Sequence, residues 1–240
     1  MTDDDRFNVK TLDYTRIHRK LKAGESEAKW DKFREHLIRE WFGLYDEGLG
    51  QLGYEPEGDN DTYTMGAFMY SSDNTLDPEL SDRWWERHRE DCRIVAVHGF
   101  SIPAPEKRDS SRMSYHANTW VREFGSHRNE LPFDKGHYIA HSIGGEIDNG
   151  IFAQRRDINR GWNEIGKLYR SMERYALDYP GVFVFSRPIY GDGSTHPFFI
   201  EYGILKEDGE WWIEVFPNRY TYTPFQGREA APEWRKQSWR

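Results

Sequence analysis

One stretch near the middle of the chain constrains the fold most, because two short apolar runs are followed there by a helical pattern. Residues 133–140 end in an apolar run typical of a strand, and the Gly- and Asp-rich residues 142–150 cannot continue it. Residues 150–154 form a second short apolar run. Beyond it, apolar side chains recur at the spacing of one buried helix face, at Trp162, Ile165, Leu168, Tyr169, Met172 and Ala176. The sequence therefore predicts the order strand, loop, strand, helix.

The predicted helix has a polar edge. At about 100° per residue, Asn159, Asn163 and Arg170 share this edge. A basic stripe runs beside it, formed by Arg160, Lys167 and Arg174. Such a stripe is more often a solvated helix face than a binding track. Asn159 also has an alternative structural role, because Asn is a favoured residue at a helix N-cap.

Three short motifs lie along this stretch: Asp134-Lys135-Gly136-His137, then Gln154, then Asn159-Arg160-Gly161-Trp162. Together they resemble the active-site signature of the DNA/RNA non-specific endonucleases, a branch of the ββα-metal (His-Me finger) nucleases. That signature reads Asp-Arg-Gly-His, then an Asn-x-x-Pro-Gln-like strand, then Asn-x-Gly-x-Trp at the start of a helix. The chain has one residue fewer before the Trp. It also departs from the signature at Lys135, at Ala153 and at Asn149 or Gly150, where Arg, Pro and Asn are expected.

The resemblance implies an α+β fold with a ββα-metal motif and a metal-dependent hydrolysis of phosphodiester bonds in DNA, RNA or both. The products would carry 5′-phosphate and 3′-hydroxyl ends, with little base specificity. His137 would be the general base, since neutral imidazole can accept a proton near pH 7. Asn159 would hold a single Mg²⁺, or Mn²⁺, through its carboxamide oxygen, because a hard ion keeps several waters and needs few protein ligands.

The resemblance also assigns roles to basic and acidic residues. An arginine would steady the pentacovalent phosphorus, and Arg122 and Arg112 are the candidates by chain order. The candidate phosphate contacts are Lys135, Arg156, Arg160 and Arg170. Many family members carry an acidic residue about two turns into the helix, for which Glu164 and Glu173 are the nearest substitutes, neither of them in register.

Other interpretations of these residues stay open. His137 and His141 stand four residues apart and would make a zinc pair on a helix, but Gly136 and the Gly144-Gly145 loop argue against a helix there. A second hypothesis is a nuclease-like module that binds without cleaving, as Lys135 and Ala153 hint. A third is an acidic nucleic-acid mimic that inhibits a basic protein.

Charge and composition limit the function further. The net charge of -8 over 240 residues argues against a protein that coats nucleic acid constitutively, although a nuclease needs only a local cationic groove. The single cysteine, Cys92, fits a reducing compartment. No secretory signal or long apolar run is evident, so we expect a cytoplasmic protein, or one exported without a Sec-type signal, that has no membrane partner. A non-specific nuclease endangers its own cell, so a toxin or defence role with an inhibitor, immunity or regulatory partner is expected.

The chain divides into two predicted regions. Residues 1–90 form a helical and acidic N-terminal region that regulates the enzyme or docks a partner. A helix is expected from Ser26 to about Leu44, and residues 42–81, which contain no Lys or Arg, are expected to be a solvated acidic loop interrupted by the apolar patch 65–70. A sharper alternative is an acidic surface that covers the cationic groove. A second short helix is expected over residues 81–91.

Residues 91–240 form the predicted endonuclease domain with a C-terminal tail. Besides the central stretch, apolar runs predict strands over 94–100, 113–124, 182–185, 198–206 and 211–216. Asp208-Gly209 is a strong hairpin turn between the last two. The sequence therefore predicts a mainly antiparallel sheet.

Overall fold

The computed structural model describes residues 10–14, 26–51, 60–73, 93–104, 133–147, 150–191 and 196–220. Within them, a six-stranded sheet has the order β1-β2-β3-β6-β7-β8, and each neighbouring pair is antiparallel. Its strands are β1 (Asn60–Met65), β2 (Phe68–Asp73), β3 (Arg93–Phe100), β6 (Phe183–Ile189), β7 (Phe199–Leu205) and β8 (Trp211–Pro217). A separate hairpin consists of β4 (Phe133–His137) and β5 (Ile151–Arg155). The α+β class and the mainly antiparallel sheet are as predicted.

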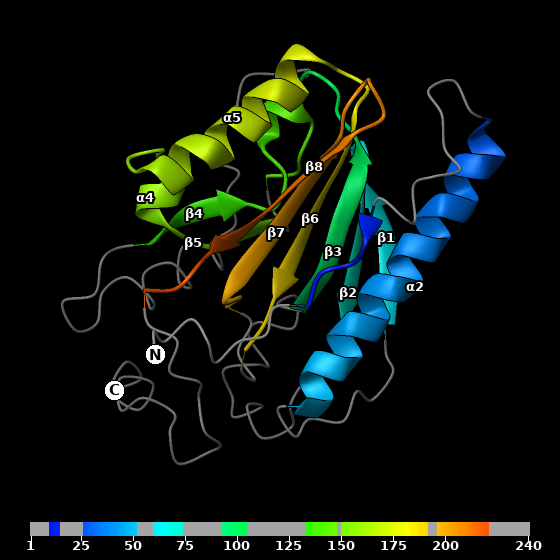
Figure 1. Cartoon of the computed structure of the whole chain (residues 1–240), viewed down its shortest axis with the longest axis horizontal. Coiled ribbons are helices and arrows are strands. Elements are labelled where there is room, and N and C mark those ends of the chain that lie inside the picture. The colour runs from blue at the N-terminus through cyan, green and yellow to red at the C-terminus, as the bar shows by residue number, and fades with distance from the viewer. Residues whose placement is uncertain are drawn as a thin grey trace.

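Both faces of the large sheet are covered. Helix α2 (Glu27–Gln51) lies on one face, and the hairpin with α4 (Arg156–Asn159) and α5 (Glu164–Asp178) lies on the other (Figure 1). Strand β6 shows why, because successive side chains point to opposite faces. Phe183 and Phe185 pack with α2, whereas Val184 packs in the core beneath α5. The continuous apolar run of β6 is thus the pattern of a strand that is buried on both sides.

Helix α2 extends beyond its predicted end. Its buried side chains follow a four-residue spacing, at Phe33, Leu37, Trp41, Tyr45 and Leu49. The prediction ended the helix near Leu44, whereas the structure continues it to Gln51. Tyr45 and Leu49 pack against Val95 of β3, and this contact stabilises a last stretch that contains several glycines. Tertiary packing therefore set the end of the helix.

The expectation of a solvated loop between residues 42 and 81 is wrong for the described part of that segment. Residues 60–73 form the hairpin β1–β2, which turns at Gly66 with a φ of 60°. Strand β2 pairs with β3, and its Phe68 and Tyr70 are fully buried in the main core. Asp73 is also buried and accepts a hydrogen bond of 2.6 Å from the Tyr45 hydroxyl. The polar residues of β2 interrupt its apolar pattern, so hydrophobicity alone did not predict this strand.

The remaining strand predictions agree with the structure within the described residues. Strands β3, β6, β7 and β8 overlap the predicted runs, and Gly209 adopts a φ of 84° in the turn between β7 and β8. The predicted helix over 81–91, the predicted strand over 113–124 and the tail beyond residue 220 lie outside the described residues. No helix within the described part of the chain has the length and hydropathy needed to cross a membrane.

A buried ion pair lies between α2 and the sheet. The Arg187 Nε donates to Glu201 Oε2 over 2.5 Å, and the side chains are only 5% and 0% exposed. Tyr14 donates to the same carboxylate oxygen over 2.8 Å and accepts from the Trp41 indole over 3.0 Å. Burial and the Glu201 charge raise the pKa of the Tyr14 hydroxyl, which stays protonated as a donor. This network joins the segment at Tyr14, helix α2 and strands β6 and β7.

Removing one partner of this ion pair is expected to destabilise the fold strongly. Glu201→Leu leaves the Arg187 guanidinium buried without a counter-charge, so the free energy of unfolding should fall by about 3–5 kcal/mol. The double variant Arg187→Met/Glu201→Leu removes both charges, and its loss should be much smaller. Urea unfolding followed by circular dichroism measures both values. Equal losses in the single and double variants would show that packing, not charge, dominates at this position.

Candidate functional site

The β4–β5 hairpin places the first two motifs side by side. Asp134 pairs with Gln154 and Gly136 with Phe152, so these four residues share one face of the hairpin. Gly136 is required there, because a Cβ at this position would lie 2.4 Å from Gln154 side-chain atoms. Gln154 itself is buried. The Gly and Gln of the two motifs are thus explained by close packing between the strands.

The helix predicted after β5 is divided into two. Helix α4 spans only Arg156–Asn159, Gly161 turns the chain with a φ of 68°, and α5 starts at Glu164. Asn163 is the N-cap of α5 and accepts from the Gly166 backbone N–H over 2.7 Å. The alternative role of Asn159 as the N-cap is therefore wrong, and Asn159 and Asn163 do not share the edge of one helix.

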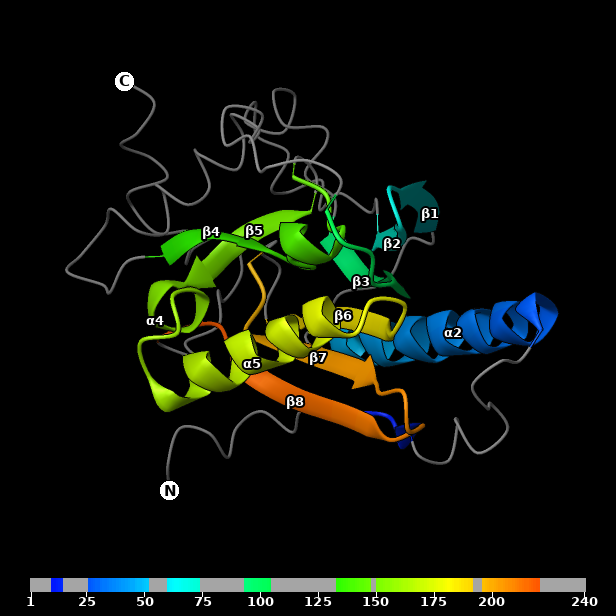
Figure 2. The same ribbon diagram turned by 90° about the horizontal axis from the view of Figure 1, so that it is seen from above.

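The predicted apolar face of this helix is wrong at its start. Trp162 precedes α5 and is 62% exposed, and Ile165 in its first turn is 41% exposed. The buried face of α5 instead carries Gly166, Tyr169, Met172 and Ala176. The break at Gly161 changes the direction of the chain, so the helical spacing does not extend back to Trp162. Figure 2 shows α4 between the hairpin and the start of α5.

Asp134 is the centre of the polar cluster on this side of the hairpin. Its carboxylate accepts from Arg156 Nε over 2.8 Å and from Arg160 Nε over 2.6 Å. The Asn159 amide nitrogen contacts it at 3.4 Å. Burial raises the pKa of Asp134, but the hydrogen bonds from Arg160, Arg156 and Asn159 outweigh it and hold this pKa below its ordinary value. Asp134 is therefore ionised near neutral pH and binds both guanidinium groups.

This cluster fixes the orientation of the Asn159 amide. A carboxylate can only accept hydrogen bonds, so the amide atom that faces Asp134 must be the nitrogen. The carboxamide oxygen, which is the predicted metal ligand, then lies on the other side of the amide carbon. Arg170 also reaches this residue and donates to the Asn159 main-chain oxygen over 3.4 Å. Three of the predicted phosphate contacts, Arg156, Arg160 and Arg170, thus lie around Asn159.

His137 is oriented by the main chain. Its Nδ1 lies 3.1 Å from the carbonyl oxygen of Glu146, and a carbonyl only accepts, so Nδ1 donates. In the neutral ring Nε2 then carries the lone pair that a general base needs. By strand alternation, His137 and Lys135 lie on the face of β4 opposite to Asp134. The predicted site residues therefore fall into two groups on the two faces of the hairpin, and Arg122 and Arg112 lie outside the described residues.

The zinc alternative lacks the geometry it needs. His137 ends a strand, and His141 begins the short 3-10 helix η4 (His141–Ile143), so the two residues do not share an α-helix face. The Nδ1 of His141 lies 3.4 Å from the Gly145 carbonyl oxygen. Across the described ranges, no group of three or more His, Cys, Asp or Glu side chains is placed to hold a metal ion.

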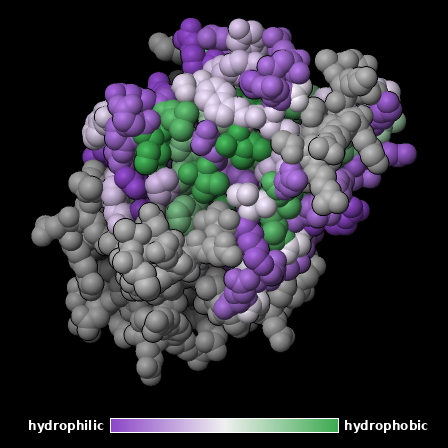
Figure 3. Space-filling view, viewed as in Figure 1, coloured by the Kyte–Doolittle hydropathy of each residue, from purple (hydrophilic) through white to green (hydrophobic). Residues whose placement is uncertain are grey.

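Two cations of the predicted basic stripe, Lys167 and Arg174, form ion pairs on α5 itself, whereas Arg160 precedes this helix. Lys167 pairs with Glu164 at 2.6 Å, Arg174 with Asp178 at 2.9 Å, and Arg170 with Glu173 at 3.9 Å. Each cation on the helix has an acidic neighbour three or four residues away. The surface over α5 is largely hydrophilic (Figure 3). This helix face is therefore a solvated surface, and the cationic character of the site comes from α4.

The role of Asp134 as the organising group was not predicted from the sequence. A signal for it was present, because Arg156 and Arg160 are one helical turn apart and can reach the same carboxylate. A second pair beside it, between Arg155 and Asp157, was also missed. Arg155 donates to Asp157 over 2.6 Å, and its guanidinium lies 4.6 Å from the centre of the Tyr220 ring.

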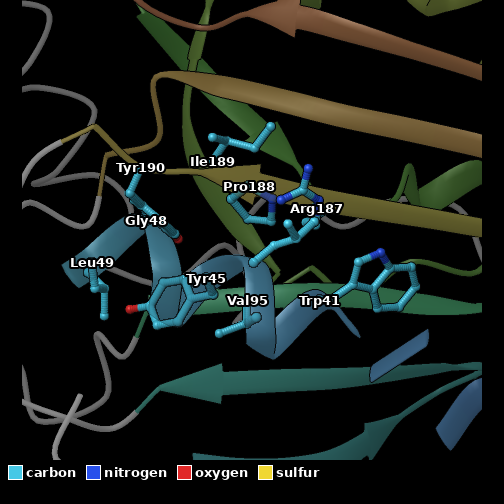
Figure 4. A pocket seen from close by; sticks show the side chains of 10 residues that line it. Trp41, Tyr45, Gly48, Leu49, Val95, Arg187, Pro188, Ile189 and Tyr190 are labelled. Carbon is cyan, nitrogen blue, oxygen red and sulfur yellow. The ribbon is translucent and has the colours of Figure 1, made fainter. Parts of the chain in front are cut away.

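A separate pocket lies on the α2 side of the sheet. Its lining includes Trp41 and Tyr45 of α2, Val95 of β3, Arg187 of β6 and Tyr190 (Figure 4). Its volume is about 40 Å³, room for roughly three water molecules at about 10–15 Å³ each. The pocket is too small for a nucleotide, and its arginine is already paired with Glu201. The hairpin with α4 is therefore the stronger candidate.

Comparison with known proteins gives no assignment. No protein-family profile matches the chain, and no curated protein matches it. The chemistry of the site is therefore inferred from its own residues alone.

A partly buried acid lies on α5 near two buried tyrosines. Glu173 is 20% exposed and lies near the hydroxyl groups of Tyr169 and Tyr202, which are buried. Burial raises the pKa of Glu173 from an ordinary 4.5 to about 7, against the opposing effect of Arg170. The folded protein therefore favours the protonated, neutral form of this carboxyl group.

Glu173 is expected to make the stability depend on pH. Between pH 4.5 and 7 the folded state holds a proton on Glu173 that the unfolded state has released, so stability falls as the pH rises through this window. Between pH 5 and pH 8, the free energy of unfolding of the wild type should therefore fall by about 1–3 kcal/mol more than that of Glu173→Gln. Urea unfolding at pH 5 and pH 8 measures the difference. Glu164→Gln, at an 89% exposed position of the same helix, is the control and should follow the wild type.

Proposed function

We propose that this protein is a metal-dependent nuclease that hydrolyses phosphodiester bonds of DNA, RNA or both, with little sequence preference. The observation that carries the proposal is the Asp134 cluster, which orients the Asn159 amide and gathers Arg156 and Arg160 beside it. The same β-strand ends in His137, whose ring is held with Nε2 as the basic nitrogen. A base, an oxygen ligand and two guanidinium groups are the parts that phosphodiester hydrolysis needs.

The residues around Asn159 fit a hard divalent ion. Its carboxamide oxygen is a neutral hard ligand, and Mg²⁺ or Mn²⁺ can keep water in its other positions. Asp134 supports this oxygen indirectly, because it holds the amide nitrogen and so fixes the rotation of the group. When bound, the ion would supply positive charge where the leaving oxygen becomes negative.

The protein residues would then bind the substrate and move a proton. Arg156 and Arg160 would exchange part of their contact with Asp134 for contact with phosphate oxygens, and Arg170 would approach from α5. His137 Nε2 would accept the proton of the attacking water. His137 and Lys135 lie on the other face of β4, and His137 Nε2 is buried, so the proposal requires substrate binding to open a path for water to this nitrogen.

A second candidate function is a nuclease-like module that binds nucleic acid without cleaving it. Two observations favour it: the charges of Arg156 and Arg160 are partly neutralised by Asp134, and His137 lies on a different face from the Asn159 cluster. An inhibitor or immunity partner, and a role as a toxin or defence effector, would follow only from the nuclease proposal.

Loss of either central residue should abolish cleavage. With Mg²⁺, the wild type is expected to nick supercoiled plasmid DNA and to degrade RNA, and chelator should stop both reactions. His137→Ala should lower the rate by about 10²–10⁴-fold, because it removes the general base. Asn159→Ala should give a comparable loss at low Mg²⁺. His36→Ala, on the outer surface of α2, is the control. A folded wild type that binds DNA but never nicks it would favour the binding module.

Asp134 should act through the metal ligand. Asp134→Asn weakens the hydrogen bond from the Asn159 amide nitrogen, so the Mg²⁺ concentration for half-maximal cleavage should rise by about 10–100-fold. The rate at saturating Mg²⁺ should change much less. A titration of cleavage rate against Mg²⁺ separates the two effects. A loss of rate that no Mg²⁺ concentration restores would contradict a role in orienting Asn159.

A further inference from the structure

Trp162 is an exposed aromatic residue held next to the Asp134 cluster. Its side chain is 62% exposed, whereas indole groups are usually buried or placed at an interface. The Arg160 guanidinium lies 5.1 Å from the centre of the Trp162 ring. Arg160 is itself fixed by two hydrogen bonds to Asp134, of 2.6 and 3.1 Å. The ring is thus joined to the proposed site through one arginine.

Hydrogen bonds hold the backbone around Trp162 in place. Its N–H donates to the Asp157 carbonyl oxygen over 2.9 Å, and Gly161 before it donates to the Ile158 carbonyl oxygen over 3.0 Å. Asn163 after it caps α5 and also donates to the Asp157 carboxylate over 2.7 Å. These contacts fix the backbone on both sides of Trp162 and so set the direction in which its side chain leaves the chain. Its exposure is therefore built into the turn between α4 and α5.

A flat aromatic ring beside a guanidinium group has the chemistry that binds a nucleic-acid base. Bases stack on aromatic side chains, and arginine adds a cation–π contribution and can contact the adjacent phosphate. In a duplex the faces of the bases are already covered by their neighbours, whereas single-stranded segments and loops expose them. Lys167 and Arg174 of α5 are paired with acids of the same helix, which weakens any competing cationic track for a duplex there.

We propose that Trp162 and Arg160 form a base-stacking platform that selects single-stranded or unpaired nucleic acid as the substrate. This inference rests on the proposed nuclease function, since it names the substrate class of the same site. The base next to the scissile phosphate stacks on Trp162, and Arg160 joins the stacked base to the Asp134 cluster. Removing the ring should weaken single-strand binding by roughly 5- to 150-fold, the range typical of one stacked base.

A binding experiment tests the platform without cleavage. The protein is labelled with 5-fluorotryptophan, and the ¹⁹F resonance of Trp162 is assigned by its absence in Trp162→Phe. In chelator, a dT oligonucleotide should shift this resonance, and a duplex of equal length at the same concentration should not. Equal shifts with both, or no shift with dT at concentrations that saturate binding, would overturn the platform.

Cleavage supplies a second readout. Trp162→Leu should raise the KM for single-stranded DNA by roughly 5- to 150-fold and leave duplex nicking nearly unchanged. Ile165→Ala, at the nearby exposed position of α5, is the matched control and should leave both unchanged. If the wild type nicks DNA but the dT oligonucleotide does not shift the Trp162 resonance, the platform is refuted and the nuclease proposal stands. A dT-induced shift in a protein that cleaves nothing would support the platform and refute the nuclease.

Discussion

Burial of the large sheet on both faces is the constraint on which the rest of the structure depends. Strand β6 divides its side chains between two cores, with Phe183 and Phe185 against α2 and Val184 beneath α5. Hydrophobic burial therefore holds α2 and α5 on opposite sides of one layer. Since α5 follows the hairpin and α4 directly, its packing through Tyr169 and Met172 also fixes where the hairpin lies. The candidate site is positioned by a core that takes no part in its chemistry.

Within that frame, one carboxylate organises the polar residues. Asp134 binds Arg156 and Arg160 and orients the Asn159 amide, so four side chains from β4, α4 and the C-cap of α4 have a single arrangement. For the proposed nuclease the same contacts carry a cost, because a guanidinium paired with a carboxylate attracts a phosphate less than a free one. Arg160 is the more exposed of the two arginines, and its guanidinium lies 5.1 Å from the centre of the Trp162 ring. Exchange of one of its two hydrogen bonds to Asp134 for a phosphate contact would resolve this conflict and keep Arg160 joined to the cluster.

Whether a sequence prediction was correct depended on the kind of sequence pattern that it used. The strands β6, β7 and β8 were predictable because they are apolar, and the turn at Gly209 because Asp-Gly favours it. Strands β1 and β2 were missed because polar residues such as Ser71 and Asp73 occupy buried positions, where partners such as Tyr45 stabilise them. The helix after β5 was predicted as continuous because the spacing of its apolar residues does not indicate a turn at Gly161. The positive φ of Gly161 ends α4, and Trp162 after it is exposed.

The sequence by itself determined the class of fold, the order of strand, strand and helix around the motifs, and the residue types that the proposed chemistry would use. Those properties depend on local periodicity and on the identity of side chains. Only the tertiary structure decided that Asp134 binds two arginines, that Lys167 and Arg174 pair with acids on α5, and that His137 and Asp134 lie on opposite faces of β4. Such relations depend on strand register and on the direction of the chain after Gly161, which no local pattern encodes.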